Sequence, residues 1–172
     1  MLAPLLERGL VKWVSMEARF WNASRIFLRH CFTAADMYNY QGAEIHLVLV
    51  DELSHFTAEI YRFLRSRVRY VMADEHWKHL LPRIICASNP GNVGHSFFKR
   101  TWVDHKPFEV WQAPDNDGGL TRAFIPARIS DNPFLLKSDP DYRKRLEGLG
   151  DPLLVRAFLE GDWSVVADTM FG

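Results

Sequence analysis

Residues 45–52 read Ile-His-Leu-Val-Leu-Val-Asp-Glu, an apolar run that ends abruptly in two adjacent carboxylates, Asp51 and Glu52. A short run rich in Val, Leu and Ile is typical of a strand that is buried on both faces of a parallel sheet. Open α/β sheets bind their ligands at the carboxyl ends of such strands. The stretch therefore predicts that the two acids lie at a ligand-binding edge of a parallel sheet.

A strand followed by two acids is also the pattern of a Walker B element in a nucleotidase. In that element the first acid holds Mg2+, and the second orients or deprotonates the attacking water. A buried strand that simply ends in two solvated acids has the same short pattern. The choice between these interpretations depends on the rest of the chain.

A second short apolar strand is expected at residues 83–87, and polar residues follow it directly. Residues 88–95 read Ser-Asn-Pro-Gly-Asn-Val-Gly-His. If the two strands are neighbours, Ser88 and Asn89 lie beside the acids, where a nucleotidase needs a polar group that senses the γ-phosphate or its water. A plain turn is the alternative, because Ser, Asn, Pro and Gly are all turn residues.

The phosphate-binding part of a nucleotidase is missing from the sequence. No GxxxxGK[ST] motif occurs in it, and the two glycines of residues 91–95 are not followed by Lys and Ser or Thr. In nucleotidases the backbone NH groups and the lysine of that motif cradle the phosphates. We therefore do not expect these residues alone to form a complete nucleotide site.

Length and composition fit one ordinary globular domain. The 172 residues carry 21 Lys and Arg against 21 Asp and Glu, so nucleic-acid binding can be argued only from local clusters of charge. Cys31 and Cys86 lack metal-binding or CxxC spacing, which predicts reduced core residues of an intracellular protein. No apolar run approaches the roughly 20 residues of a membrane span.

Other chemical motifs are weaker. The seven histidines do not have the spacing of paired metal ligands. Asp115, Asp117 and Asp131 lack the spacing and the closing Glu of a calcium loop, so we expect a solvated acidic loop at residues 113–119.

Periodicity and turn residues predict the elements around these motifs. Strands are expected at 11–14, 18–21, 25–31, 45–50, 83–87, 108–112 and 121–125. Helices are expected at 57–70, with Thr57 as its cap, at 96–102, from Pro140 to Gly148 or Gly150, and from Pro152 to Gly161, while residues 131–133 are expected to form a turn. Arg62, Arg65, Arg67 and Arg69 are expected to be a solvated face of the first of these helices.

Taken together, the motifs resemble those of the large terminase subunit of tailed bacteriophages, over residues 21–171. Four pieces in family-like order carry the resemblance. They are YQGAE at 40–44; VDELSHF at 50–56 with LRSRVR at 64–69; ASNPGNVGH at 87–95; and ISDNPF at 129–134 with Tyr142 and LEGDW at 159–163.

The resemblance implies a fold and a set of site residues. The fold would be an incomplete P-loop, RecA-like ATPase domain with a mainly parallel sheet that lacks the phosphate-loop segment. Residues 1–163 would form the C-terminal portion of that domain, and 164–172 the start of the connection to a nuclease domain. Asp51 would be the Walker B magnesium residue, Glu52 the catalytic carboxylate, and Ser88 with Asn89 the coupling motif.

The resemblance also implies a function. The chain would be part of an ATP-hydrolysing motor that moves viral DNA into a procapsid in the host bacterial cytoplasm, with Mg2+ and ATP as cofactors. The implied partners are double-stranded DNA, the portal protein and the small terminase subunit, with a homo-oligomeric ring on the procapsid and no membrane. The chain by itself is expected to bind neither cofactor tightly and to be inactive.

Two departures from the family leave alternatives open. The chain begins after the expected phosphate loop and stops before the nuclease acids, so a helicase-like ATPase piece and a non-catalytic prophage remnant or binding module stay possible. Many relatives have Arg-Gly where this chain has Gln41-Gly42, and that arginine acts on a neighbouring subunit's nucleotide. Glutamine cannot supply the charge, which leaves Arg65, Arg67 and Arg69 as candidates.

Overall fold

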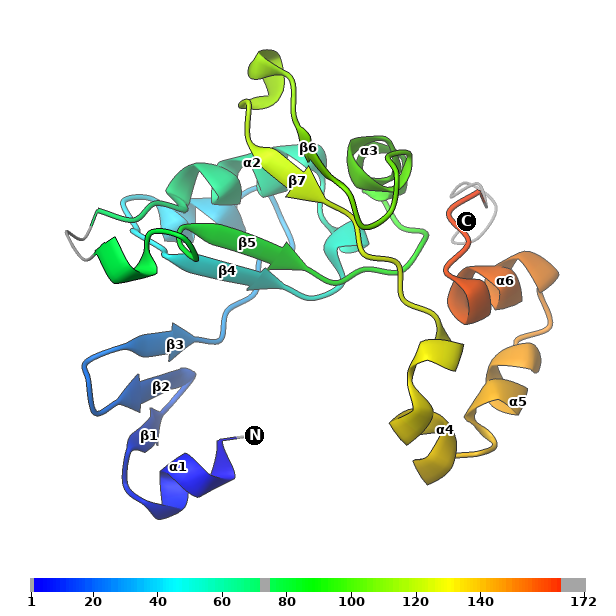
Figure 1. Cartoon of the computed structure of the whole chain (residues 1–172), viewed down its shortest axis with the longest axis horizontal. Coiled ribbons are helices and arrows are strands. Elements are labelled where there is room, and N and C mark those ends of the chain that lie inside the picture. Colours follow the sequence, from blue (N-terminus) through cyan, green and yellow to red (C-terminus); the bar gives the residue numbers. More distant parts are fainter. Residues whose placement is uncertain (1, 72–74, 165–172) are drawn as a thin grey trace.

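The computed structural model describes residues 2–71 and 75–164. The described strands form three small, separate sheets (Figure 1). The first is antiparallel and contains β1 (Val11–Val14), β2 (Glu17–Phe20) and β3 (Arg25–Phe27); the second is the parallel pair β4 (Leu47–Val50) and β5 (Arg83–Cys86); the third is the antiparallel pair β6 (Val110–Gln112) and β7 (Thr121–Ala123).

The expected RecA-like domain with a mainly parallel sheet is therefore wrong. Five of the seven described strands are in antiparallel sheets, and only β4 and β5 run parallel. The physical reason is the length of the connections. Two residues join β1 to β2, with Ser15 at φ 56°, and tight turns of this kind close hairpins locally. A parallel neighbour needs a long crossover, and the segment between β4 and β5 provides one.

That crossover contains α2 (Ala58–Arg67), the longest described helix. The Thr57 side chain accepts a hydrogen bond from the Ile60 backbone NH at 3.3 Å, which confirms the expected cap. The helix ends three residues earlier than expected because the chain turns extended at Val68 (ψ 108°). Val68 then forms a bridge with Ile45, just before β4.

The remaining described helices are short. They are α1 (Ala3–Glu7), α3 (His95–Phe98), which continues into the π-helical turn η4 (Lys99–Val103), α4 (Pro133–Ser138), α5 (Tyr142–Glu147) and α6 (Pro152–Glu160). Short 3₁₀ segments lie at η1 (Asp36–Tyr40), η2 (Leu53–His55), η3 (Glu75–Trp77), η5 (Asp115–Asp117) and η6 (Ile129–Asp131).

The ends of α6 agree with the sequence, and so does the end of α5 at Gly148, whereas the starts of α4 and α5 differ from the expected ones. Asp151 accepts a hydrogen bond from the Leu153 NH at 2.8 Å, and Gly161 ends α6 with φ 63°. The expected turn at 131–133 is instead the start of α4, because Asn132 caps the Leu135 NH at 3.0 Å and Pro133 occupies the first helical position. The helix expected from Pro140 begins only at Tyr142.

Burial of β4 and β5 on both faces is also wrong. The exposed fractions are 42% for Leu47, 67% for Leu49 and 52% for Ile85, whereas Val50 is 9% exposed. Alternate side chains point to opposite faces of a strand, so one face of the pair is buried and the other is open. The described chain covers only one face of this pair.

The buried side chains form two apolar clusters that meet at α2, and the buried face of β4 and β5 belongs to the first. The first contains Val50, Leu53, Tyr61, Phe98 and Trp163. The second contains Cys31, Met37, Ile60 and Leu64. Because Tyr61 faces one cluster while Ile60 and Leu64 face the other, α2 is the element on which both are built.

Figure 1 shows β4, β5, α2 and α3 at the centre, with the β1–β3 sheet on one side and α4–α6 on another. Cys31 and Cys86 are both free thiols, and burial raises the pKa of Cys86 to about 12. No helix in the described part of the chain is long and apolar enough to cross a bilayer.

Candidate functional site

The structure brings the two polar loops of the sequence together. Val50 and Cys86 are paired in register at the ends of the parallel strands β4 and β5. Asp51 and Glu52 follow the first strand, and Ser88 and Asn89 follow the second after one residue. Both loops therefore leave the same edge of the sheet, as the sequence predicted for neighbouring strands.

Glu52 is the residue that joins the loops. Its Oε1 accepts a hydrogen bond from Asn89 Nδ2 at 3.4 Å. Glu52 also has left-handed backbone angles, φ 50° and ψ 52°. A residue with a side chain costs about 1–2 kcal/mol in this conformation, and such strain concentrates at functional sites. The strain directs an exposed carboxylate toward the amide of Asn89.

Asp51 is exposed and keeps most of its oxygen lone pairs free. Its Oδ1 accepts a hydrogen bond from the Glu52 NH at 3.1 Å. In residues 2–71 and 75–164, no three His, Cys, Asp or Glu side chains converge on one point as metal ligands. A single carboxylate fits Mg2+ of the nucleotide-bound kind, which takes one or two protein carboxylates and fills its other positions with phosphates and water.

Ser88 has a positioning role. Its Oγ accepts a hydrogen bond from the Ser54 NH at 2.9 Å and donates to the Asn89 carbonyl at 3.2 Å. The hydroxyl thus ties the second loop to η2, the turn that follows the acids. Of the two residues predicted as a coupling motif, only Asn89 is hydrogen-bonded to an acid.

More bonds fix the two loops against each other. The Leu53 NH donates to the Ala87 carbonyl at 2.9 Å, and the Gly94 NH donates to the Ser54 carbonyl at 2.8 Å. The Asn92 side-chain amide lies 3.4 Å from Ser54 Oγ, which is fully buried. Neither loop can move without breaking bonds to the other.

His95 connects this region to the C-terminal part of the chain. Its Nδ1 accepts a hydrogen bond from the Gly91 NH at 2.9 Å, and its ring stacks on Trp163 with centroids 5.2 Å apart. Burial, followed by the positive charge of Lys99, lowers the pKa of His95. The ring is therefore neutral at pH 7 and acts as an acceptor.

Many members of the family that the sequence resembles carry an arginine where this chain has Gln41, and three other arginines are candidates for its role. Each of them contacts another residue of the chain. Arg65 Nη1 lies 3.2 Å from Asp117 Oδ1 and its side chain is 17% exposed. Arg67 stacks on the Phe63 ring at 5.2 Å, and Arg69 Nε lies 3.5 Å from a Glu44 carboxylate oxygen. Each of the three therefore has a partner within the chain, and Arg65 is more enclosed than Arg69.

One cluster of charges was missed by the sequence analysis. Asp117, expected in a solvated loop, is paired with Arg62, Arg65 and Arg122 at 3.8, 3.2 and 2.8 Å. Burial raises the pKa of Asp117, but hydrogen bonds and charge from Arg122 and Arg65 outweigh this and lower it. The spacing of Arg62 and Arg65 on one helical face was the available signal, but their partner is more than 50 residues away along the chain.

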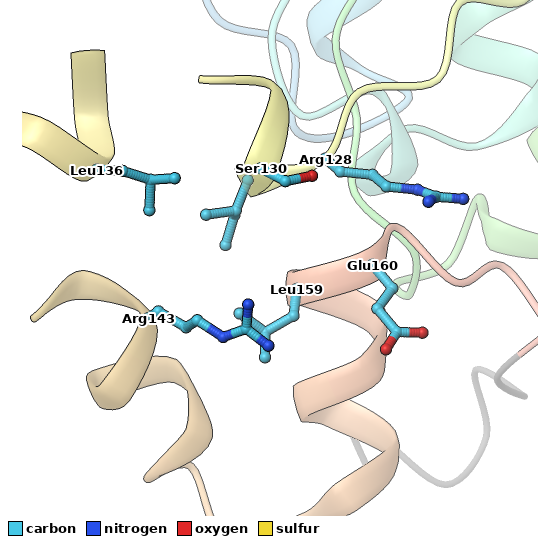
Figure 2. A pocket seen from close by; sticks show the side chains of 7 residues that line it. Arg128, Ser130, Leu136, Arg143, Leu159 and Glu160 are labelled. Carbon is cyan, nitrogen blue, oxygen red and sulfur yellow. The ribbon is translucent and has the colours of Figure 1, made fainter. Parts of the chain in front are cut away.

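A pocket of about 440 Å³ lies apart from the Asp51–Glu52 site, between the η6–α4 segment and the helices α5 and α6. Figure 2 shows the Arg143 side chain extending toward Leu159, with Ser130 and Leu136 across the opening. None of the predicted site residues lines this pocket.

Residues 165–172, which include most of the expected connection to a nuclease domain, lie outside the described residues. No protein-family model, curated protein or solved structure matches the chain.

Proposed function

We propose that the chain carries the hydrolytic carboxylates of an ATP-driven motor that packages viral DNA, as the resemblance to terminase large subunits implies. Asp51 would hold Mg2+, Glu52 would position the attacking water, and Asn89 would report the state of the γ-phosphate. Double-stranded DNA would be the moving partner, held through its phosphates without reading of sequence. The host cytoplasm is the compartment in which such a motor works.

The observation that carries the proposal is the hydrogen bond between Glu52 and Asn89 across the ends of two parallel strands. The two residues are 37 positions apart in the sequence, and each follows one of the two parallel strands. A carboxylate bonded to a side-chain amide can pass a change at the nucleotide to a second loop.

The proposal concerns this βαβ unit and its edge, and not the architecture of the whole chain. β4, α2 and β5 place the acids and Asn89, while the remaining described strands form antiparallel sheets of their own. The sequence has no GxxxxGK[ST] motif, so the chain by itself lacks the phosphate cradle. We therefore expect the purified chain to show no ATP hydrolysis above that of Glu52→Gln.

A genetic experiment tests the motor function directly. Asp51→Asn and Glu52→Gln are introduced into the genome that encodes the chain, and particles are counted by electron microscopy and by the DNA that they protect. Both variants are expected to yield empty procapsids, with filled particles reduced at least roughly 100-fold, because loss of a catalytic group costs this much or more. Asp115→Asn, an acid outside the site, serves as the matched control.

Normal filling in both variants would contradict the motor function and favour a non-catalytic binding module.

A second experiment tests the metal-binding role of Asp51 separately from the motor function. Mn2+ added with ATP is expected to broaden the backbone amide resonances of residues 51–54 and 87–89 in the purified chain, and Asp51→Asn is expected to abolish this effect. Equal broadening in Asp51→Asn would show that Asp51 is not the metal ligand.

A further inference from the structure

A second pocket, of about 390 Å³, lies where α2, the α3–η4 segment and the β6–β7 hairpin meet. These elements lie side by side in Figure 1. The residues that line it are Arg62, Phe97, Arg100, Thr101, His105, Trp111, Pro114, Asn116, Asp117 and Arg122. It shares no residue with the Asp51–Glu52 site, and its volume is within the range of small-ligand sites.

The pocket has an excess of positive charge. Arg62, Arg65 and Arg122 share the single carboxylate of Asp117. Arginine stays charged at any physiological pH, so two of these three charges are not compensated. Arg100 adds another, since no ion pair of its guanidinium occurs in the described part of the chain.

The arginines divide into an inner and an outer pair. The side chains of Arg65 and Arg122 are 17% and 8% exposed, and both donate hydrogen bonds to Asp117. Arg62 is 53% exposed, and at 3.8 Å it lies farther from the carboxylate than the inner pair does. Arg100 is also exposed. The inner pair holds the β6–β7 hairpin on α2, and the outer pair remains available to a ligand.

Aromatic rings form part of the pocket wall. His105 and Trp111 are stacked almost parallel, with centroids 4.2 Å and planes 8° apart. Arg62 lies over the Phe97 ring at 4.9 Å, which fixes the direction of its guanidinium. His105 is exposed, and its stack on Trp111 holds a flat ring at the pocket where a further planar group can join it.

We propose that this pocket binds a nucleotide, either free or as one unit of a nucleic-acid strand. Arg62 and Arg100 bind the phosphate through charge-assisted hydrogen bonds, and the base stacks on the His105–Trp111 pair. Guanidinium groups match phosphate oxygens in geometry, and aromatic rings accept any base on their faces. A phosphate beside a planar base is the ligand chemistry that uses both the surplus cations and the rings.

Binding of a fluorescent single-stranded oligodeoxythymidylate to the full chain, followed by anisotropy at low salt, tests the proposal. Arg62→Gln combined with Arg100→Gln is expected to weaken binding at least 10-fold, because each removes a charge-assisted bond. The slope of log affinity against log salt is expected to become shallower by about 0.7 for each arginine removed. Arg143→Gln, which removes an exposed arginine of α5 outside this pocket, is the control.

The contribution of the rings is measured separately. His105→Ala is expected to weaken binding about 10-fold without changing the salt slope, since stacking is insensitive to ions. Thymidine monophosphate is expected to compete at lower concentration than inorganic phosphate. Equal competition by the two, or an unchanged affinity of His105→Ala, would overturn the assignment of a base to the stack.

The proposal as a whole would be overturned if the double arginine variant binds as tightly as Arg143→Gln. If free thymidine monophosphate competes as effectively as unlabelled oligonucleotide, the ligand is a free nucleotide. If the oligonucleotide binds more tightly, the ligand is a nucleic-acid strand. Asp51→Asn is expected to leave this binding unchanged. Failure at this pocket is therefore distinguishable from failure of the motor function, which is measured at Asp51 and Glu52.

Discussion

Glu52 adopts a backbone conformation that residues with a side chain rarely adopt, with φ 50° and ψ 52°. The strain is held in place by the hydrogen bonds of Leu53 and Ser54 to the segment at Ala87–Ser88. The carboxylate is thereby directed to Asn89, whose Nδ2 lies 3.4 Å from Oε1. In the proposed motor, the strain at Glu52 lowers the stability of the fold and fixes the position of the catalytic carboxylate.

Replacement of Glu52 by Gly should therefore stabilise the chain while removing the catalytic group. We expect Glu52→Gly to raise the free energy of unfolding by about 0.5–1 kcal/mol, because glycine adopts positive φ without steric cost. Urea denaturation followed by circular dichroism measures the change. Glu59→Gly, inside α2, is the control and should lower stability by about 1 kcal/mol. A destabilised Glu52→Gly would show that Glu52 is not strained.

His95 makes stability depend on pH through its lowered pKa. A histidine in the unfolded chain has a pKa of about 6.5. Because the folded value is lower, the unfolded chain binds the proton more readily, and the contribution of neutral His95 is present above that pH and is lost as pH falls below it. The protonated ring could no longer accept the Gly91 NH.

We expect the free energy of unfolding to fall between pH 7.5 and pH 5.5, and to fall less in His95→Gln, which cannot titrate. Urea denaturation of both proteins at the two pH values is the measurement. His105→Gln controls for the loss of an exposed histidine. An identical decrease in wild type and His95→Gln would exclude His95 as the source of the pH dependence.

At the scale of elements, the loop after β5 depends on close packing at Gly94. A Cβ at this position would collide with the Phe56 carbonyl oxygen and with the Phe98 ring. The Gly94 NH also donates to the Ser54 carbonyl at 2.8 Å, so the backbone cannot retreat without breaking that bond. This glycine is required by a close approach and not by its backbone angles.

Gly94→Ala is accordingly expected to lower the free energy of unfolding by about 1–3 kcal/mol, the cost of overpacking a dense interior. Thermal unfolding followed by circular dichroism measures it. Gly148→Ala is a suitable comparison, because a Cβ there meets its nearest atoms only at 3.4 Å. If Gly94→Ala were as stable as Gly148→Ala, the loop would have more freedom than its packing indicates.

The local signals for α2 and α6 were readable in the sequence because capping is a short-range interaction. Thr57, Asp151 and Gly161 act within one turn of their helices, so sequence and structure agree there. At α4 the same chemistry was misread. Asn132 and Pro133 are residues of a turn and equally of a helix start, and the neighbouring sequence does not decide between them.

For the whole molecule, buried side chains are distributed unevenly. Three residues of α2 are buried, whereas α4 and α5 bury none and α6 buries only Ala157. Trp163, 9% exposed and packed in the central cluster, is the main anchor of the segment that follows α6. Local opening needs less free energy where few apolar side chains are buried.

We therefore expect the amide hydrogens of α4 and α5 to exchange with solvent far faster than those of α2, β4 and β5. Hydrogen–deuterium exchange followed by NMR or mass spectrometry measures this. Trp163→Ala should increase exchange in α6 and in the loop at His95, its stacking partner, with less effect in β1–β3. Uniform protection along the chain would contradict this division.

The candidate site was largely accessible to sequence reasoning, and the sheet around it was not. Asp51 and Glu52 and the loop with Asn89 each follow an apolar strand, and that local pattern sufficed to expect them at one edge. How many strands join them depends on pairings between distant segments. The same apolar residues can form a hairpin or a parallel sheet, and for this reason the prediction of a larger parallel sheet was wrong.

By itself the sequence determined the strands and helix of the βαβ unit, the N-terminal cap of that helix at Thr57 and the order of the polar residues after each strand, because these depend on neighbours a few residues away. Only the tertiary structure decided that Asp117 gathers three arginines, that His95 stacks on Trp163, and that one face of β4 and β5 is open. Each of these joins segments far apart in the chain. Long-range contacts arise from the packing of whole elements, and local residue patterns do not encode them.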